Sequence, residues 1–187
     1  MELHLNNKTA LITGASKGIG KAIAESMAKE GCNLILTARS EDKLKSLKET
    51  LQKNHNISVE ILAIDLSKKN SVEKVSDFSG DIDILINNAG AIPPGSLSDI
   101  DEDTWRNAWN LKLFGYINLT RLIYNKMKAS KSGVILNIIG SAGQKPMYNY
   151  IAGTTANAGL MAFTKALSNG STANGIRVLG INPGFTT

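Results

Sequence analysis

Cysteine is almost absent from this sequence, which has a single one, Cys32, in 187 residues. One cysteine excludes an internal disulfide framework and fits a protein of the reducing cytoplasm. No apolar run approaches the ~18 residues that a membrane-spanning helix needs. Residues 1–6 lack the basic segment followed by an apolar one that marks a signal peptide. We therefore expect a cytoplasmic protein without a membrane anchor.

Histidine is also scarce, since His4 and His55 are the only two. No group of histidine, cysteine and acidic residues has the spacing of a metal site. The net charge of +5 suits an acidic ligand, but the basic residues are mixed with acidic ones, as over residues 41–49. Because no dense basic block with interleaved aromatic residues occurs, we expect neither a metal nor nucleic acid as a partner.

The remaining composition is that of an ordinary globular domain. Hydrophobic residues make up 42% of the sequence and charged residues 20%, both usual fractions for soluble proteins. A length of 187 residues is enough for one substantial core. We therefore expect residues 1–187 to form a single domain.

One glycine-rich stretch, residues 13–20 (TGASKGIG), lies between two regular patterns. The apolar residues 9–12 before it predict a buried strand, and residues 21–28 after it predict an amphipathic helix. The start of a helix leaves backbone N–H groups unpaired and carries partial positive charge. Glycine lets the chain turn sharply and lets a phosphate approach the backbone. The stretch predicts a site for a dinucleotide pyrophosphate, although a glycine triplet alone is a weak signal.

Strands and helices alternate regularly along the rest of the chain. The expected strands are continuous apolar runs, as in strands that are buried on both faces. They cover residues 9–12, 33–37, 59–64, 82–86, 134–139 and 176–181, and helices are expected over residues 21–28, 41–52, 71–78, 101–127 and 154–168. This order predicts the α/β class, with a doubly wound parallel sheet between two helical layers, the Rossmann fold. A ligand of the glycine turn should lie across the carboxyl ends of the strands.

Four motifs at these strand ends resemble the short-chain dehydrogenase/reductase family. They are the glycine turn, with three residues between its first two glycines, Asp65-Leu66, Asn87-Asn88-Ala89-Gly90 and Asn182-Pro183-Gly184. The resemblance extends over nearly the whole chain. It implies a nicotinamide cofactor and hydride transfer to or from a small-molecule carbonyl or alcohol.

The choice between NADP(H) and NAD(H) can be argued from charge. A carboxylate after the second strand would bind a ribose 2′-hydroxyl and repel a 2′-phosphate. Residues 37–40 contain no acid, and Arg39 offers a charged planar fork for phosphate. Lys17 in the glycine turn adds a second cation, although both could be ordinary surface cations of a basic protein. We expect NADP (NADPH), with NAD less favoured.

The resemblance also assigns the contacts of the cofactor. Asp65 would bind the adenine amino group and Leu66 would pack beside the ring, while Asp65 could instead cap the helix that follows. The cofactor-binding residues that the resemblance implies are Gly14, Ser16, Lys17, Gly18, Ile19, Gly20, Arg39, Asp65, Leu66, Asn88, Ala89, Gly90, Asn157, Pro183 and Gly184.

The catalytic end departs from the family pattern. The family uses a tyrosine as general acid/base, a lysine four residues later, a serine that polarises the substrate oxygen, and an asparagine on the preceding long helix. Counting from neighbouring segments that match the family places Gly153 at the position of the family's tyrosine, Asn157 at that of its lysine and Gly140 at that of its serine. Lys112 falls at the position of the family's asparagine, and shifting the match by two residues would place Asn110 there instead. All four usual residues are then replaced.

Lys112 and Asn157 look like an exchange of the family's asparagine and lysine. Lys112 could present an ammonium near the nicotinamide ribose, with Asn157 as its neutral partner. Alternatively, the exchange is drift in a site that is no longer under catalytic demand. Both interpretations stay open.

A substitute proton donor is needed because Gly153 carries none. Tyr150 lies three residues earlier and shares a helical face with it if the helix begins early enough. Tyr148 is less well aligned, and Tyr116 could share a face with Lys112. A neighbouring cation would lower the pKa of a tyrosine toward acid/base use, whereas packing is the commoner role of such rings. We predict as catalytic residues Tyr150, Ser141 (as the donor to the substrate oxygen), Lys112 and Asn157.

The sequence stops at Thr187, soon after the sixth expected strand. Family members that resemble it continue through substrate-covering helices and a seventh strand, so we expect a longer natural chain. The family's dimer pairs the two helices expected over residues 101–127 and 154–168. These helices carry more apolar residues than one face needs, which predicts a homodimer or homotetramer; the residues are Leu113, Phe114, Ile117, Leu160, Met161 and Phe163.

Two functions follow from these observations. The first is an NADP(H)-dependent oxidoreductase with a non-standard proton donor. The alternative is a catalytically inactive NADP(H)-binding protein that acts as a sensor or as a partner subunit. The intact glycine and Asn-Asn-Ala-Gly motifs argue against a third possibility, a purely structural domain.

Overall fold

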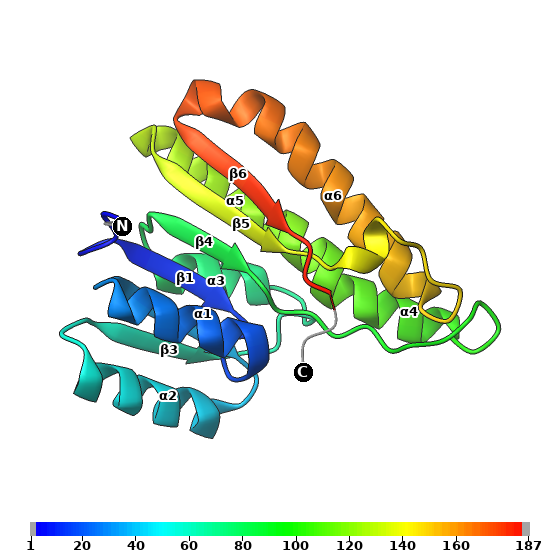
Figure 1. The fold of residues 1–187 in the computed structure, drawn as a ribbon, viewed down its shortest axis with the longest axis horizontal. Helices are drawn as coiled ribbons and strands as arrows, with labels where there is room; N and C mark the ends of the chain where they lie inside the picture. The colour runs from blue at the N-terminus through cyan, green and yellow to red at the C-terminus, as the bar shows by residue number, and fades with distance from the viewer. Residues whose placement is uncertain (1–2, 185–187) are drawn as a thin grey trace.

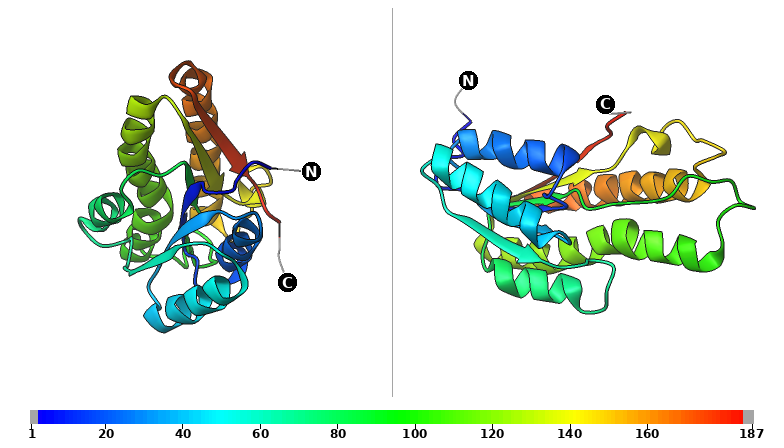
Figure 2. Two further views of the ribbon diagram at one scale, coloured as in Figure 1. Left: turned by 90° about the vertical axis from the view of Figure 1, so that its left-hand side faces the viewer. Right: turned by 90° about the horizontal axis from the view of Figure 1, so that it is seen from below.

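A computed structural model describes residues 3–184 and contains one six-stranded parallel sheet with helices on both faces (Figures 1 and 2). The strands are β1 (Thr9–Thr13), β2 (Asn33–Ala38), β3 (Val59–Ala63), β4 (Ile84–Asn87), β5 (Gly133–Ile138) and β6 (Ile176–Ile181). They pair in the order β3-β2-β1-β4-β5-β6, so the chain reverses its direction of winding between β1 and β4. This order confirms the predicted Rossmann fold, in which ligands bind at the carboxyl ends of the strands beside the reversal.

Each face of the sheet has its own helical layer. Helices α1 (Gly18–Lys29) and α2 (Glu41–Asn54) pack on one face, and α3 (Ser71–Ser79), α5 (Gly115–Ser130) and α6 (Ile151–Ser171) pack on the other. Successive side chains of a strand point to opposite faces. In β1, Ala10 and Ile12 join the core under α1 and α2, whereas Leu11 joins the core under α3 and α5. Burial on both faces explains why the strands are continuous apolar runs.

The long helix expected over residues 101–127 is not continuous. It consists of α4 (Glu102–Trp109), a π-helical segment (Asn110–Phe114) and α5. A π-turn holds one more residue than an α-turn and often marks a functional site. The 3.6-residue pattern that predicts a helix carries no signal for such an insertion, so the π-helical segment was not predicted from the sequence. Lys112 lies at the centre of this segment.

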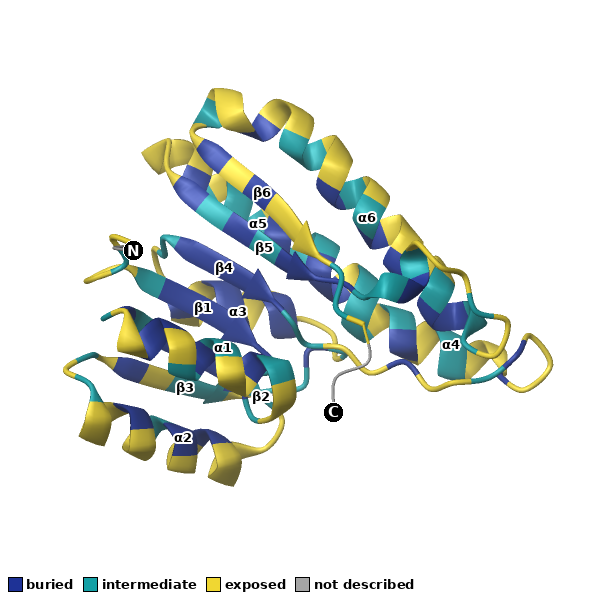
Figure 3. Ribbon diagram, viewed as in Figure 1, coloured by how far each residue is buried: buried dark blue, intermediate teal, exposed yellow. Residues whose placement is uncertain are grey.

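The helical layer of α1 and α2 does not extend over β5 and β6. On that side, Val134 and Leu136 of β5 are only half buried, and Leu179 and Ile181 of β6 are 52% and 49% exposed. Leu136 and Leu179 are register partners, so these side chains share one surface. Figure 3 shows the exposed residues along β6. Within residues 3–184, no element covers this apolar surface.

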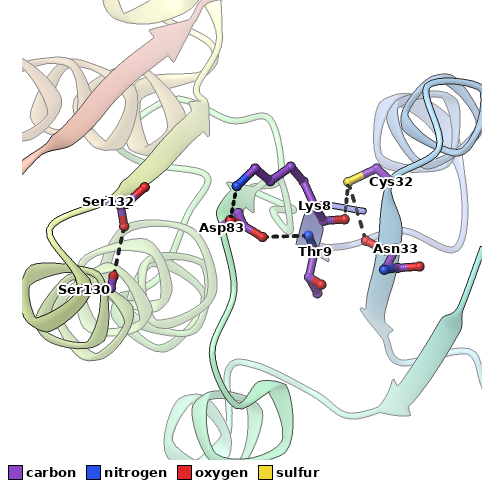
Figure 4. A network of polar contacts seen from close by, with 7 residues as sticks. All are labelled: Lys8, Thr9, Cys32, Asn33, Asp83, Ser130 and Ser132. Carbon is purple, nitrogen blue, oxygen red and sulfur yellow. Dashed lines mark hydrogen bonds and ion pairs between the residues drawn. The ribbon is translucent and has the colours of Figure 1, made fainter. Parts of the chain in front are cut away.

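A polar network ties the amino ends of three strands together (Figure 4). The Asp83 carboxylate accepts hydrogen bonds from Lys8 Nζ at 2.8 Å and from the Thr9 backbone N–H at 2.9 Å, and Cys32 Sγ lies 3.0 Å from the Lys8 carbonyl. Partial burial alone would raise the pKa of Asp83, but these hydrogen bonds outweigh it and lower the pKa. Burial raises the pKa of the Cys32 thiol to about 11, so this cysteine is no nucleophile at neutral pH.

A second network crosses the sheet beneath the carboxyl ends of β4 and β5. Asn87 Nδ2 donates to Thr120 Oγ1 and to Asn137 Oδ1, both at 2.9 Å, and Asn137 Nδ2 donates to Thr164 Oγ1 at 2.9 Å. All four side chains are buried. The network therefore links α5, β4, β5 and α6 into one unit.

We expect Asn137→Ala to lower the free energy of unfolding by about 2–4 kcal/mol, because it removes the acceptor of Asn87 and the donor to Thr164 and opens a cavity. Urea unfolding measures this change. The control Asn107→Ala, at an exposed position of α4, should alter it by less than about 0.5 kcal/mol. Equal effects of the two substitutions would show that the network adds no stability.

Candidate active site

Hydrogen bonds hold the glycine turn against the end of β4. Thr13 Oγ1 accepts the backbone N–H groups of Asn88 at 2.9 Å and Ala89 at 3.0 Å. Asn88 Nδ2 donates to the carbonyls of Thr13 at 3.0 Å and Gly14 at 3.2 Å. Gly14 has φ 68°, and a Cβ there would lie 2.9 Å from Ala89 Cα. Two motifs that are far apart in the sequence thus form one rigid joint.

The turn forms a cradle at the start of α1. Gly18 opens the helix with φ 56°, and a Cβ there would meet no atom within 4 Å. The N-cap residue Lys17 makes no side-chain capping hydrogen bond, so it leaves the N–H groups of the first turn to a ligand. The residues present therefore fit the pyrophosphate of a dinucleotide.

A hollow of about 250 Å³ continues from this cradle along the ends of β1 to β4. Lys43 in the first turn of α2 also lines it, and the sequence analysis missed this residue. The predicted cofactor residues in its walls are Gly14, Ser16, Lys17, Arg39, Asp65, Leu66, Asn88, Ala89 and Gly90. Three predicted residues lie elsewhere in the turn: Gly18 lines a neighbouring hollow between α1 and α2, Gly20 packs beneath Gly14, and the Ile19 side chain packs on the core.

Asp65 is held in an ionised state at the end of β3. Its Oδ1 accepts from the Ser67 N–H at 3.0 Å and from Ser67 Oγ at 2.7 Å. Burial alone would raise the pKa of Asp65, but the Ser67 hydrogen bonds and the nearby charges of Arg39 and Lys68 lower it. The carboxylate caps its own turn and not the following helix α3, which begins at Ser71, so the alternative role given to it was wrong.

A second hollow, of about 490 Å³, lies at the ends of β5 and β6. Its walls bring together five of the predicted residues: Ser141, Tyr150, Asn157, Pro183 and Gly184. The Ser141 N–H donates to the Pro183 carbonyl at 2.9 Å, which ties the turn after β5 to the turn after β6. Pro94 and Met147 also line the hollow, and no motif marked them in the sequence.

Tyr150 occupies the space that a side chain at position 153 would need. Tyr150 is the N-cap residue of α6, and a Cβ built on Gly153 would overlap the carbons of the Tyr150 ring. The backbone on either side is fixed by Gly95, which binds Asn149 and Ile151. Burial raises the pKa of the Tyr150 hydroxyl above its ordinary value, so the group stays protonated at neutral pH. The tyrosine that lies near a cation is Tyr116, whose ring centroid is 5.9 Å from Lys112 Nζ, and its pKa is raised by burial and not lowered.

Asn157 fills the space beside Gly140. A Cβ at Gly140 would lie 2.9 Å from Asn157 Nδ2, so a serine there would require the amide to move. Asn157 is only 3% exposed, and its Oδ1 has no hydrogen-bond partner among residues 3–184. A buried acceptor without a partner costs free energy, which a ligand hydroxyl or N–H group in the hollow would recover.

Lys112 lines neither hollow, but it contacts one wall residue of each, Gly90 and Ile139. Its Nζ donates to the Ile139 carbonyl at 2.6 Å, at the end of β5, and its aliphatic chain runs beneath Gly90. Burial lowers the pKa of Lys112 to about 8, and no carboxylate among the described residues offsets the burial of its charge. The structure therefore holds the ammonium at a backbone carbonyl. Asn110, the alternative at this position, lies on the outer surface.

The other two tyrosines that the sequence offered as donors are excluded. Tyr116 is buried, donates its hydroxyl to the Ile138 carbonyl at 2.9 Å, and has its pKa raised by burial, so its candidacy was wrong. Tyr148 is 79% exposed and lies outside the walls of the hollow.

The described residues contain neither a cluster of metal ligands nor a membrane-spanning helix. Between residues 3 and 184, no three histidine, cysteine or acidic side chains come close enough together to hold a metal ion. No helix in that range combines the length and the apolar character needed to cross a bilayer.

The family model for short chain dehydrogenases matches residues 8–187. This chain belongs to the short-chain dehydrogenase/reductase family. The 3-oxoacyl-acyl-carrier-protein reductase FabG of Vibrio harveyi is 33% identical to it over 190 residues, which cover 98% of this chain and 75% of the relative.

Solved structures of short-chain dehydrogenases and reductases superpose closely on the chain. L-sorbose reductase from Gluconobacter frateurii, complexed with NADPH and L-sorbose, has a TM-score of 0.94 and 32% identity. The match covers 99% of this chain and 72% of the reductase. A short-chain dehydrogenase from Sphingobium yanoikuyae in complex with NADPH has a TM-score of 0.92 and 28% identity, over 96% of this chain and 72% of its own.

We expect Lys112→Met to raise the free energy of unfolding at pH 7 by about 1–2 kcal/mol, because it removes a buried charge at the cost of one hydrogen bond. The pKa of Lys112 is about 8 in the folded state, against the ordinary 10.5. Between these two pKa values the unfolded chain binds more protons than the folded chain, so the free energy of unfolding of the wild type should rise with pH across this window. The stability advantage of Lys112→Met should therefore shrink as the pH rises.

Urea unfolding of both proteins between pH 7 and pH 10.5 measures this effect. The control Lys165→Met replaces an exposed lysine of α6 and should produce no such pH-dependent difference. A Lys112→Met protein that is less stable at every pH would contradict the buried-charge argument.

Proposed function

We propose that this short-chain dehydrogenase/reductase uses NADP(H) to transfer hydride to or from a small-molecule carbonyl or alcohol. The observation that carries the proposal is the pair of hollows at the carboxyl edge of the sheet, one at the ends of β1 to β4 and one at the ends of β5 and β6. One holds unpaired cations beside the glycine turn, and the other holds the hydroxyl groups of Ser141 and Tyr150. A dinucleotide that follows the edge would place its adenosine end in the first hollow and its nicotinamide in the second.

The preference for NADP(H) rests on Lys17 and Arg39. Both line the first hollow, and no acid lies at the end of β2 to repel a phosphate. The guanidinium of Arg39 can donate two parallel hydrogen bonds to a 2′-phosphate, and Lys17 adds a point charge. The L-sorbose reductase from Gluconobacter frateurii and the short-chain dehydrogenase from Sphingobium yanoikuyae were both solved in complex with NADPH, which supports the same choice here.

Tyr150 is our proposed proton donor in the reduction. When bound, the reduced nicotinamide supplies the hydride to the carbonyl carbon. Ser141 donates a hydrogen bond to the carbonyl oxygen, and the electron pair of the C=O π bond moves onto that oxygen. The Oη–H bond of Tyr150 breaks, its proton passes to the oxygen, and solvent returns a proton to the tyrosinate. Oxidation of an alcohol runs through the same steps in reverse.

Asn157 and Lys112 support this arrangement in different ways. The unpartnered Oδ1 of Asn157 accepts a hydrogen bond from a hydroxyl of the nicotinamide ribose. Lys112 is a positioning residue, because its bond to the Ile139 carbonyl fixes the backbone next to Gly140 and Ser141. The exchange of the two residue types thus moves the cation out of contact with the ligand.

A cofactor-binding protein without turnover is the second candidate, as a sensor or a partner subunit. The raised pKa of Tyr150 favours it, because a tyrosine with no nearby cation is a weak acid at neutral pH. The neutral Asn157 stands where the family places the lysine that acidifies its tyrosine. In this case the first hollow binds the cofactor and the second hollow performs no chemistry.

Fluorescence titration with NADPH and NADH, followed by NADPH oxidation against a panel of carbonyl compounds, separates the two candidates. Binding with turnover supports the oxidoreductase, and binding without any turnover on the full natural chain supports the sensor. Equal affinity for both cofactors would overturn the roles given to Lys17 and Arg39.

For an active protein, we expect Tyr150→Phe to lower kcat about 10²–10⁴-fold, because it removes the proton donor. The Kd for NADPH should stay unchanged. Wild-type reduction should be flat through neutral pH and fall only above about pH 10, since the donor is active below its raised pKa. The matched control Tyr148→Phe changes an exposed ring outside the hollow and should retain full activity. Unchanged turnover in Tyr150→Phe would remove the tyrosine from the mechanism.

We also propose that the chain forms a homodimer or homotetramer through α4, the π-helical segment and α6. Phe114 is 48% exposed and lines a hollow with Trp105 and Trp109, whose rings meet edge to face with centroids 5.8 Å apart. Leu113, Met161 and Phe163 are only partly buried nearby. Leu160 does not contribute, because it is fully buried, so its inclusion among the surplus apolar residues was wrong.

We expect Phe114→Asp to shift sedimenting species from dimer or tetramer toward monomer, because it places a charge in the apolar contact. Sedimentation velocity over a concentration series measures the shift. The control Phe78→Asp changes an aromatic residue that is 40% exposed on α3, outside the proposed contact, and should leave assembly intact. A wild-type chain that is monomeric at all concentrations would refute the proposal.

A further inference from the structure

Lys43 lies in the first turn of α2 and shares the first hollow with Lys17 and Arg39. Lys17 and Lys43 also both line the neighbouring hollow between α1 and α2. The two lysines are therefore shared by the walls of both hollows, whereas Arg39 lines only the first of them. Lys43 lies outside the cofactor-binding motifs, so it was not among the predicted contacts.

These three cations are not neutralised by the rest of the described chain. Of the neighbouring acids, Glu41 binds Lys45 at 2.8 Å and Glu25 lies 3.8 Å from Lys21. Asp42 lies beside Lys43 in the wall of the neighbouring hollow between α1 and α2 and forms no ion pair with it. No ion pair joins Lys17, Arg39 or Lys43 to an acid within residues 3–184. Asp65 is the one carboxylate in the wall of the first hollow, and it is engaged by Ser67. The excess positive charge favours a multiply charged anion at this point.

The start of α2 adds to the same field. Ser40 is its N-cap residue and makes no side-chain capping hydrogen bond, so its hydroxyl and the N–H groups of the first turn remain available to a ligand. Ser40 also lines the first hollow. Cations from two different helices and a strand end thus meet at a helix N-terminus.

We infer that Lys43 is a third ligand of the cofactor's 2′-phosphate and a determinant of the preference for NADP(H). The inference rests on the proposed NADP(H)-dependent function. A ribose phosphate carries close to two negative charges, and one cation at its side leaves it undercompensated. Lys43 adds a third positive charge to those of Lys17 and Arg39 in the wall of this hollow. The residue acts on the phosphate alone, so it has no effect on a cofactor that lacks this group.

Titration of the full chain with NADPH and NADH tests the assignment. We expect Lys43→Gln to raise the Kd for NADPH about 5–10-fold and to leave the Kd for NADH within about twofold. The effect should shrink as salt rises from 0.05 to 0.5 M, because the contact is exposed to solvent. Lys43 is exposed on the surface of α2, so the substitution should not disturb folding, which circular dichroism checks.

Two variants make the result specific. Lys45→Gln is the matched control, because Lys45 lies on the same helix and is paired with Glu41; it should change neither Kd. Arg39→Gln is the positive reference and should weaken NADPH binding more than Lys43→Gln does.

The outcomes distinguish failure of this inference from failure of the proposed function. If wild-type protein binds NADPH no more tightly than NADH, the assignment of NADP(H) fails and Lys43 has no phosphate to bind. If wild-type protein prefers NADPH and Arg39→Gln loses the preference while Lys43→Gln keeps it, only the inference about Lys43 is overturned. Equal weakening by Lys43→Gln and Lys45→Gln would show a general charge effect and would also overturn it.

Discussion

The amide of Asn88 and the hydroxyl of Thr13 hold the site together. Asn88 donates to two successive carbonyls of the glycine turn, while Thr13 accepts two N–H groups from the chain after β4. These four hydrogen bonds cross the point where the sheet reverses its winding. They fix where α1 begins, and with it the direction of its unpaired N–H groups. The cation-lined hollow and the path toward the second hollow both start from this joint.

Glycines at positions 140 and 153 make room for larger side chains. Gly140 leaves room for the Asn157 amide, and Gly153 leaves room for the Tyr150 ring. In both places the side chain that enters comes from α6 or its N-cap. The result is a cavity lined by Ser141, Tyr150 and Asn157, so two glycines in this region do not leave it without polar side chains.

The sequence predicted most of the fold because the signals were local. Strand runs buried on both faces, glycine at tight turns and polar residues at strand ends each follow from short stretches of chain, and the first hollow brought together nine of the expected residues. The π-helical segment and the direction of Lys112 could not be predicted, because both depend on packing between α5 and the end of β5. Lys43 was missed for a similar reason: nothing in α2 alone indicates that this lysine faces the glycine turn.

The overlap of the Tyr150 ring with position 153 also constrains how position 153 can be substituted. A side chain at position 153 would meet the Tyr150 ring, so the ring would have to move aside to admit it. Any substitution that adds a Cβ at position 153 should therefore also displace the Tyr150 hydroxyl. The two positions are physically coupled, and the effects of substitutions at positions 150 and 153 should not be additive.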